Sequence, residues 1–155
     1  MYHHVAPDQG PDFGDLVRAP MTSADDYDAM PAYAVDLLGD VRGRRVLILG
    51  VAYRGGVKET AFSGAFAVRD ELTARGADPV AQDPLYDAGE LSALGFNAWD
   101  GGTIDAVLVQ ADHAGYAGLG PDDLPGARAV VDGRGILDPA RFAAAGIRVK
   151  RIGRP

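Results

Sequence analysis

The sequence predicts an α/β protein built on a doubly wound, mainly parallel β-sheet. Short apolar runs recur along the chain, and the run Val46–Leu49 has none of the alternating polar residues that mark a half-exposed strand. Such a run is typical of a strand buried on both faces. Strand patterns alternate with helical ones, and this order predicts parallel strands joined by crossovers. The strands are expected at 46–49, 77–84, 104–110, 127–132 and 148–152.

The first part of the chain predicts a lead-in followed by one helix. Residues 1–23 are rich in Pro, Gly and Asp, so we expect a flexible segment in which the adjacent His3 and His4 hold no metal. Residues 24–39 predict a helix that ends at Gly39, with a kink or a restart at Pro31. Its apolar stripe consists of Tyr27, Met30, Ala34, Leu37 and Leu38.

The segment 45–63 organises the rest of the chain. After the first strand, Gly50 and the pair Gly55–Gly56 predict a loop, and Ser63 is a candidate N-cap for the next helix. Backbone N–H groups at such a corner favour an anion, and Arg54 adds a guanidinium suited to phosphate. The glycine spacing fits neither a Gly-x-Gly-x-x-Gly fingerprint nor a Walker loop. On spacing alone, a wide turn without a ligand explains the loop equally well.

Later polar residues lie where the predicted strands end. Asp83 could hold a ribose, but the missing glycine fingerprint favours a turn at Asp83–Pro84. His113, after the third strand, is interpreted as a structural cap rather than a general base. Arg134 follows the fourth strand, and Asp138 predicts the cap of a helix over 138–146. The final strand mixes charged and apolar residues and is expected at a sheet edge.

Two arginines far apart in sequence are expected at one edge of the sheet. Arg54 follows the first strand and Arg134 the fourth, and the carboxyl ends of parallel strands share an edge. Two neighbouring guanidiniums repel unless an anion lies between them, so this placement predicts a phosphate ligand. The alternative for Arg134 is a helix cap or an ion pair with Asp132 or Asp138.

Composition excludes several classes of function. The net charge of −7 opposes binding to a nucleic-acid backbone, and the 155 residues contain no cysteine for a disulfide, a thiolate metal site or a nucleophile. No apolar run approaches the length of a membrane span. We expect a cytoplasmic protein that binds neither nucleic acid nor membrane.

Three segments resemble the C-terminal domain of the UDP-glucose, UDP-N-acetylmannosamine and GDP-mannose 6-dehydrogenases. They are 28–35 with its Met-Pro pair, 46–63, and 130–139 with its Val-Asp-Gly-Arg and Asp-Pro motifs. The resemblance covers roughly residues 25 to 154 in the family's order. Three positions depart from the family pattern: Arg54 replaces Lys, Ala61 replaces Arg, and Gly64 replaces Pro.

The resemblance implies a Rossmann-like, UDP-sugar-binding domain over residues 40–155, preceded at 24–39 by part of the family's interdomain helix. By the matching motifs, Tyr53, Arg54 and Arg134 bind the UDP-sugar. The family oxidises the sugar with NAD through a cysteine, and both the NAD domain and that cysteine lie outside the matched portion. We therefore expect no catalytic, cofactor or metal residue in this chain, and no hydride transfer by it alone. The alternatives are a non-catalytic dimerisation or regulatory module that uses the Met30–Leu38 helix, and an NAD-binding domain that uses Asp83.

Overall fold

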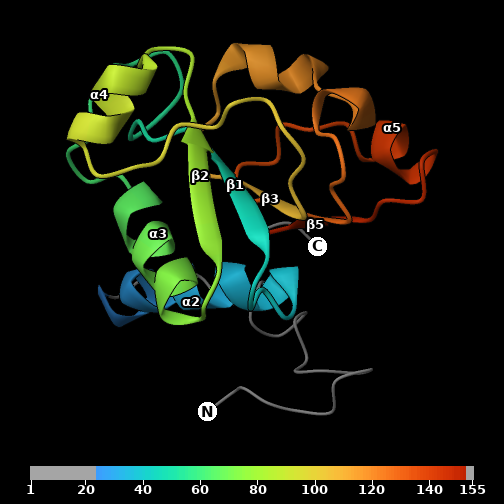
Figure 1. Ribbon diagram of the computed structural model, residues 1–155, viewed down its shortest axis with the longest axis horizontal. Helices are drawn as coiled ribbons and strands as arrows, with labels where there is room; N and C mark the ends of the chain where they lie inside the picture. The colour runs from blue at the N-terminus through green and yellow to red at the C-terminus, as the bar shows by residue number, and fades with distance from the viewer. Residues whose placement is uncertain (1–23, 153–155) are drawn as a thin grey trace.

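A computed structural model describes residues 24–152 and confirms the α/β class and the parallel sheet (Figure 1). The strands are β1 (Arg45–Leu49), β2 (Asp78–Gln82), β3 (Ala106–Val109), β4 (Ala129–Asp132) and β5 (Val149–Arg151). The α-helices are α2 (Ala24–Leu38), α3 (Ala65–Ala74), α4 (Ala88–Ala93) and α5 (Pro139–Ala143), with 3₁₀ turns η1 (Ala114–Gly118) and η2 (Pro121–Asp123).

The sheet order is β2-β1-β3-β4-β5, and every neighbouring pair is parallel. The chain therefore moves from β1 to one side of the sheet to form β2, and then to the other side for β3. Strand β5 lies at an edge, as its mixed pattern predicted. In an open parallel sheet, the point where strand order reverses is where ligands bind, outside the carboxyl ends of the strands. Here that point lies between β1 and β3.

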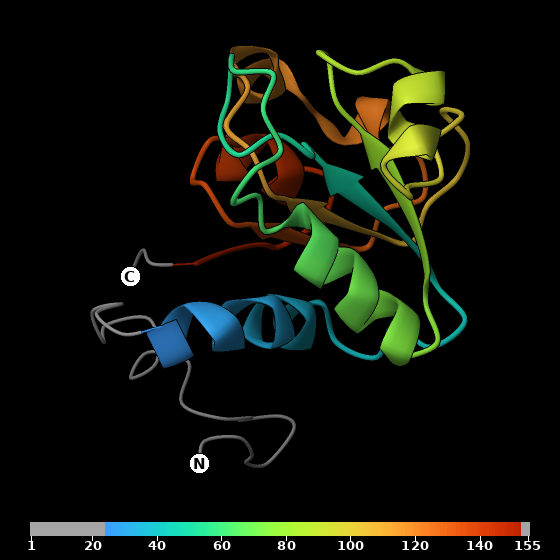
Figure 2. The ribbon, with the colours of Figure 1, turned by 90° about the vertical axis from the view of Figure 1, so that its left-hand side faces the viewer.

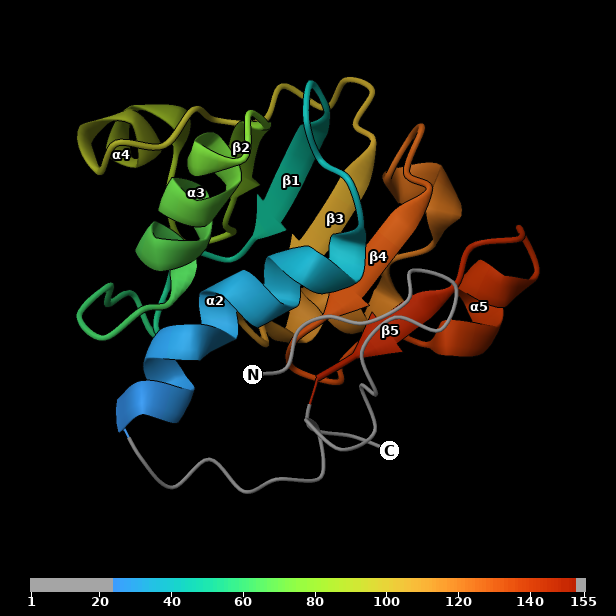
Figure 3. The same ribbon diagram turned by 90° about the horizontal axis from the view of Figure 1, so that it is seen from below.

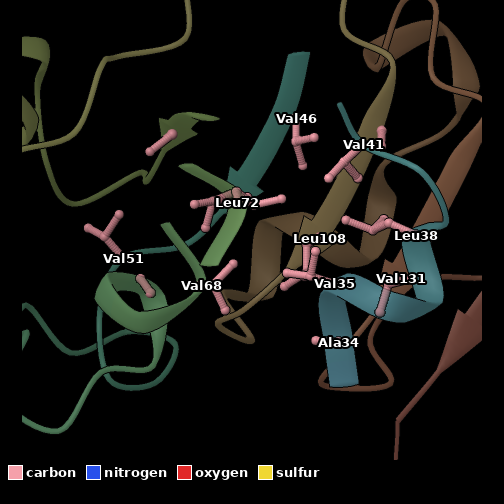
Figure 4. Packing of buried hydrophobic residues seen from close by; sticks show 14 of the residues in the cluster. Ala34, Val35, Leu38, Val41, Val46, Val51, Val68, Leu72, Leu108 and Val131 are labelled. Atoms are coloured by element: carbon pink, nitrogen blue, oxygen red, sulfur yellow. The ribbon is translucent and has the colours of Figure 1, made fainter. Parts of the chain in front are cut away.

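Helices α2 and α3 cover one face of the sheet (Figures 2 and 3). Side chains from alternate sheet positions, such as Val46 and Leu108, pack there in one cluster with Val35 of α2 and Leu72 of α3 (Figure 4). All four of these side chains are at most 2% exposed. The alternation of strand side chains across the sheet explains why the intervening positions serve the other face.

The second face is covered by short helical elements. Leu47, Val107 and Val130 point to this side, where they pack with Leu124 and Phe142. The cover comes from η1, η2 and α5, and no long α-helix lies on this face within residues 24–152. The sequence predicted this for 121–126, where Pro121 and Gly126 leave room only for a single turn.

Helix α2 runs unbroken from Ala24 to Leu38, so the chain does not restart at Pro31. Of its predicted apolar stripe, Ala34, Leu37 and Leu38 are buried in the core of this same chain. The Nζ of Lys150 in β5 donates to the Leu37 carbonyl at 2.9 Å, which holds the end of α2 against the sheet. The role of helix α2 in a dimer stays a prediction.

Some predictions concern residues outside the described part of the chain, namely the flexible lead-in, the His3–His4 pair and the side chain of Tyr27. Between residues 24 and 152, no helix is long and apolar enough to cross a membrane.

Candidate functional site at the carboxyl edge of the sheet

Loops after β1, β3 and β4 meet at the carboxyl edge of the sheet. The first runs from Gly50 to Gly64, the second covers 110–113 and the third covers 133–135. The first two are in direct contact. A Cβ at Gly55 would lie 2.2 Å from the carbonyl oxygen of Asp112, so only glycine permits this approach. Gly50 is equally constrained, because a Cβ there would lie 2.5 Å from that of Ala111.

Asp112 connects these loops through its carboxylate. Its Oδ1 accepts the Gly55 N–H at 2.6 Å and lies 3.6 Å from Nη2 of Arg134. The Gly55 hydrogen bond, helped by the nearby guanidinium, holds the pKa of Asp112 below its ordinary value. The group stays ionised at neutral pH, and one carboxylate therefore tethers both arginine-bearing loops.

Arg134 reaches from the loop after β4 to the loop after β3. Its Nη1 donates to the Gln110 carbonyl at 3.4 Å, and its side chain remains 33% exposed. The predicted alternatives for Arg134 were a helix cap or a pair with Asp132 or Asp138. Its ionic partner is instead Asp112, while the Asp132 carboxylate accepts the backbone N–H of Arg134 at 3.0 Å. That buried carboxylate shapes the loop and leaves the guanidinium at the rim.

Arg54 and Tyr53 are exposed on the loop after β1. The Arg54 guanidinium makes no hydrogen bond or ion pair with any residue of the described range 24–152. Tyr53 is 47% exposed, and its ring meets that of Phe62 edge to face at 6.4 Å. The next residue after Arg54, Gly55, is bound by the same carboxylate that contacts Arg134. Both arginines thus belong to loops joined at one rim.

The backbone donors of this corner are mostly occupied, which corrects one expectation. The Gly55 N–H is bonded to Asp112 and the Gly56 N–H to His113. Helix α3 begins at Ala65, with Gly64 rather than Ser63 at the N-cap position, although the Ser63 hydroxyl accepts the Ala65 N–H at 3.1 Å. An anion here would therefore depend mainly on guanidinium groups.

Gln110 joins the loop after β3 to the start of α3. With its amide turned to satisfy both ends, its nitrogen donates to the Gly50 carbonyl at 3.0 Å and its oxygen accepts the Gly64 N–H at 3.2 Å. Together with Ser63, Gln110 therefore takes up first-turn donors of α3 that a phosphate would otherwise use.

Asp83 is a structural junction and does not present a free carboxylate. It is 3% exposed, and its Oδ2 accepts the Val51 and Ala52 N–H groups at 2.8 and 3.1 Å. Its Oδ1 accepts the Leu85 N–H at 2.8 Å, which is the predicted turn. A ribose has no access to this group. The residues present therefore do not fit a dinucleotide such as NAD, since they also lack its glycine fingerprint.

His113 is likewise buried, at 3% exposure, with its Nε2 2.9 Å from Oδ2 of Asp83. The ring packs edge to face against Tyr116, whose own pKa is raised by burial. The buried position and these contacts agree with a structural role for His113.

Sequence reasoning gave no role to Gln110 or Asp112, and the only available signal was their position just after a buried strand. Among residues 24–152, no three or more His, Cys, Asp or Glu side chains are grouped so that they could hold a metal ion.

Comparison with known families identifies the domain. The sequence pattern of the UDP-glucose/GDP-mannose dehydrogenase family, UDP binding domain, matches residues 47–139, which is more than half of the chain. The chain belongs to this family. The matched range contains every loop of the site described above. Comparison with curated protein sequences gives no match.

Solved structures share the fold. The UDP-D-ManNAc dehydrogenase of Pyrococcus horikoshii matches with a TM-score of 0.64 at 21% identity, over 84% of this chain and 32% of that one. An NDP-N-acetyl-D-galactosaminuronic acid dehydrogenase from Methanosarcina mazei Go1 gives 0.65 at 20% identity, over 90% and 35%. A UDP-glucose dehydrogenase from the archaeon Pyrobaculum islandicum gives 0.59 at 26% identity, over 76% and 31%. The chain thus spans about a third of the length of these structures.

Proposed function

We propose that this chain is the UDP-sugar-binding domain of an NAD-dependent nucleotide-sugar 6-dehydrogenase, an enzyme that oxidises a UDP-sugar to a UDP-uronic acid. In this proposal the diphosphate lies between the guanidiniums of Arg54 and Arg134, and Tyr53 contacts the ligand from the same loop as Arg54. The family membership of the domain supports the ligand class. In this proposal the chain binds the UDP-sugar, and none of its residues is catalytic.

One observation carries the proposal. Arg134 and Gly55, the neighbour of Arg54, share the Oδ1 atom of Asp112, so two guanidinium-bearing loops are tied to one rim. Arg54 has no partner among the described residues, and Arg134 has a long ion pair of 3.6 Å with Asp112 and a long hydrogen bond of 3.4 Å to the Gln110 carbonyl. Two such cations at one edge are complementary to a diphosphate, which accepts paired donors from guanidinium groups.

Titration calorimetry with UDP tests the proposal. A hydrogen bond to a charged group contributes about 1.5–3 kcal/mol, so we expect Arg134→Ala to weaken UDP binding by about tenfold or more. Arg128→Ala is the matched control, because Arg128 is also exposed but precedes β4 at the opposite edge of the sheet. We expect its affinity to equal that of the unaltered chain. Equal affinity in the Arg134→Ala variant would refute the site.

A homodimer through the Met30–Leu38 segment and a cytoplasmic location are expected from the sequence and the family. Sedimentation of the purified chain measures the first directly, and a stable dimer without nucleotide affinity would favour the dimerisation module instead.

A further inference from the structure

His113 holds the glycine pair of the loop that carries Tyr53 and Arg54. The Gly56 N–H donates to His113 Nδ1 at 3.1 Å, next to the bond from Gly55 to Asp112. These two bonds span 57 positions of sequence and attach the Gly55–Gly56 turn of that loop to the segment after β3. Gly56 itself has a positive φ of 77°, so it forms a tight turn at this point.

The partners of His113 define its protonation state. A backbone N–H can only donate, so Nδ1 must be the acceptor and cannot carry a proton. The proton of the neutral ring therefore lies on Nε2, which donates to Oδ2 of Asp83 at 2.9 Å. Asp83 is held in place by the N–H groups of Val51 and Ala52, at the beginning of the same loop. The imidazole consequently bridges both ends of the segment 51–56.

Protonation of this ring breaks one bridge and keeps the other. An imidazolium has a donor on both nitrogens, so Nδ1–H would face the Gly56 N–H and the two donors could not bond. The other groups around the ring are the Asp83 carboxylate, the Tyr116 ring and, one residue away, Asp112 with its partner Arg134. Tyr116 turns its hydroxyl to Gln82 and offers the ring no acceptor. Among residues 24–152, the Gly56 N–H is the only hydrogen-bond partner of Nδ1.

We propose that His113 is a positioning residue that holds the Tyr53–Gly56 loop in its binding arrangement only while the imidazole is neutral. Acidification that protonates His113 releases Gly56 and weakens the binding of a nucleoside diphosphate at the rim. The weaker binding of a nucleoside diphosphate rests on the proposed function, whereas the release of Gly56 does not. His113 touches neither ligand nor reacting atoms in this assignment; it acts through the loop.

Amide hydrogen exchange measured by NMR on the unaltered chain tests the release. We expect the protection of the Gly56 amide to fall as the pH is lowered, with a one-proton dependence that follows the imidazole signals of His113. The Gly50 amide is the internal reference, because it donates to the backbone carbonyl of Gln82 at 2.8 Å and has no titrating partner. Constant protection of Gly56 while His113 titrates would overturn the proposal. A proton on Nδ1 at neutral pH would overturn it as well.

Two substitutions separate the bridges of the imidazole. In His113→Asn the side-chain oxygen takes the place of Nδ1, so we expect Gly56 to stay protected at every pH. In His113→Gln the amide reaches the place of Nε2 and leaves Gly56 without an acceptor, so we expect its protection to be low at every pH. If the Gly56 amide were more protected in His113→Gln than in His113→Asn, Nδ1 would not be its acceptor and the proposal would be wrong.

Calorimetry with UDP then tests the coupling to binding. UDP itself takes up a proton near pH 6, so the ratio of affinities between the unaltered chain and His113→Asn is the quantity to compare across pH. We expect this ratio to fall by about threefold to tenfold on acidification, the effect of one ordinary hydrogen bond. A constant ratio would refute the coupling. If the chain bound no UDP at any pH, the proposed function would be refuted. The hydrogen exchange of the Gly56 amide would still show whether protonation of His113 releases Gly56.

Discussion

Replacement of Asp83 by asparagine perturbs the junction of the site with almost no change in volume. The Asp83 carboxylate lies after β2 and joins three loops, through Val51 and Ala52 after β1, Leu85 in its own turn, and His113 after β3. Its side chain is buried, so water cannot take over its bonds to Val51, Ala52 and His113. The substitution exchanges one acceptor oxygen for an NH₂ donor.

The expected cost follows from these bonds. In the better orientation the amide oxygen stays at the Oδ2 position and keeps three partners, and the NH₂ group faces the Leu85 N–H. The partly buried Leu85 N–H then loses its partner, at about 1–3 kcal/mol, and each remaining bond loses about 1 kcal/mol of charge assistance. The relief from burying a charge offsets part of this loss. We expect Asp83→Asn to lower the free energy of unfolding by about 2–4 kcal/mol, a large share of a typical 5–15 kcal/mol.

Urea unfolding followed by circular dichroism measures this change. Asp78→Asn is the matched control, because Asp78 begins the same strand but is 63% exposed and pairs with Arg45 only at 3.8 Å. We expect the control to differ from the unaltered chain by less than about 0.5 kcal/mol. If Asp83→Asn were as stable as the Asp78 variant, the carboxylate would not be the junction described.

Three further changes give distinct expectations. Phe62 is 93% exposed with φ +65°, so Phe62→Gly should raise the unfolding free energy by up to about 1 kcal/mol in urea titrations, whereas Phe62→Ala, which keeps a Cβ, should give no gain. Leu72 is fully buried against α2 and the sheet, so Leu72→Ala should cost about 2–5 kcal/mol in the same assay, and a loss below 1 kcal/mol would contradict the core packing. Asp112→Asn keeps an oxygen for Gly55 but removes a negative charge beside Arg134, so calorimetry should give UDP affinity about fivefold higher, and unchanged or weaker binding would argue against a phosphate at this guanidinium.

The central strands were predictable because a strand that is buried on both faces has an uninterrupted run of apolar residues in the sequence. The run Val46–Leu49 has no polar residue, and β1, which contains it, pairs with a strand on each side in the interior of the sheet. Strand β5 lies at an edge of the sheet, and its sequence accordingly mixes charged and apolar residues. The convergence of the loops after β1 and β4 followed from the rule that carboxyl ends of parallel strands share an edge.

The interior of the site was not predictable, because it depends on contacts between distant positions. The hydrogen bonds from Gly55 N–H to Asp112 and from Gly56 N–H to His113 each span 57 residues, and their geometry depends on how closely two loops approach. An aspartate after a strand has the same local sequence whether it holds a ribose or three backbone N–H groups. The left-handed backbone of Phe62 had no signal either, since that conformation is typical of glycine and asparagine.

The most direct measurement of where the nucleotide binds is a UDP titration followed by the backbone amide signals of the ¹⁵N-labelled chain. The largest shifts are expected for Gly55 and Gly56 after β1 and for Arg134 and Gly135 after β4. The amide of Arg128, at the opposite edge of the sheet, should not move. Shifts concentrated at that opposite edge, or no shift at saturating UDP, would contradict a diphosphate held between Arg54 and Arg134.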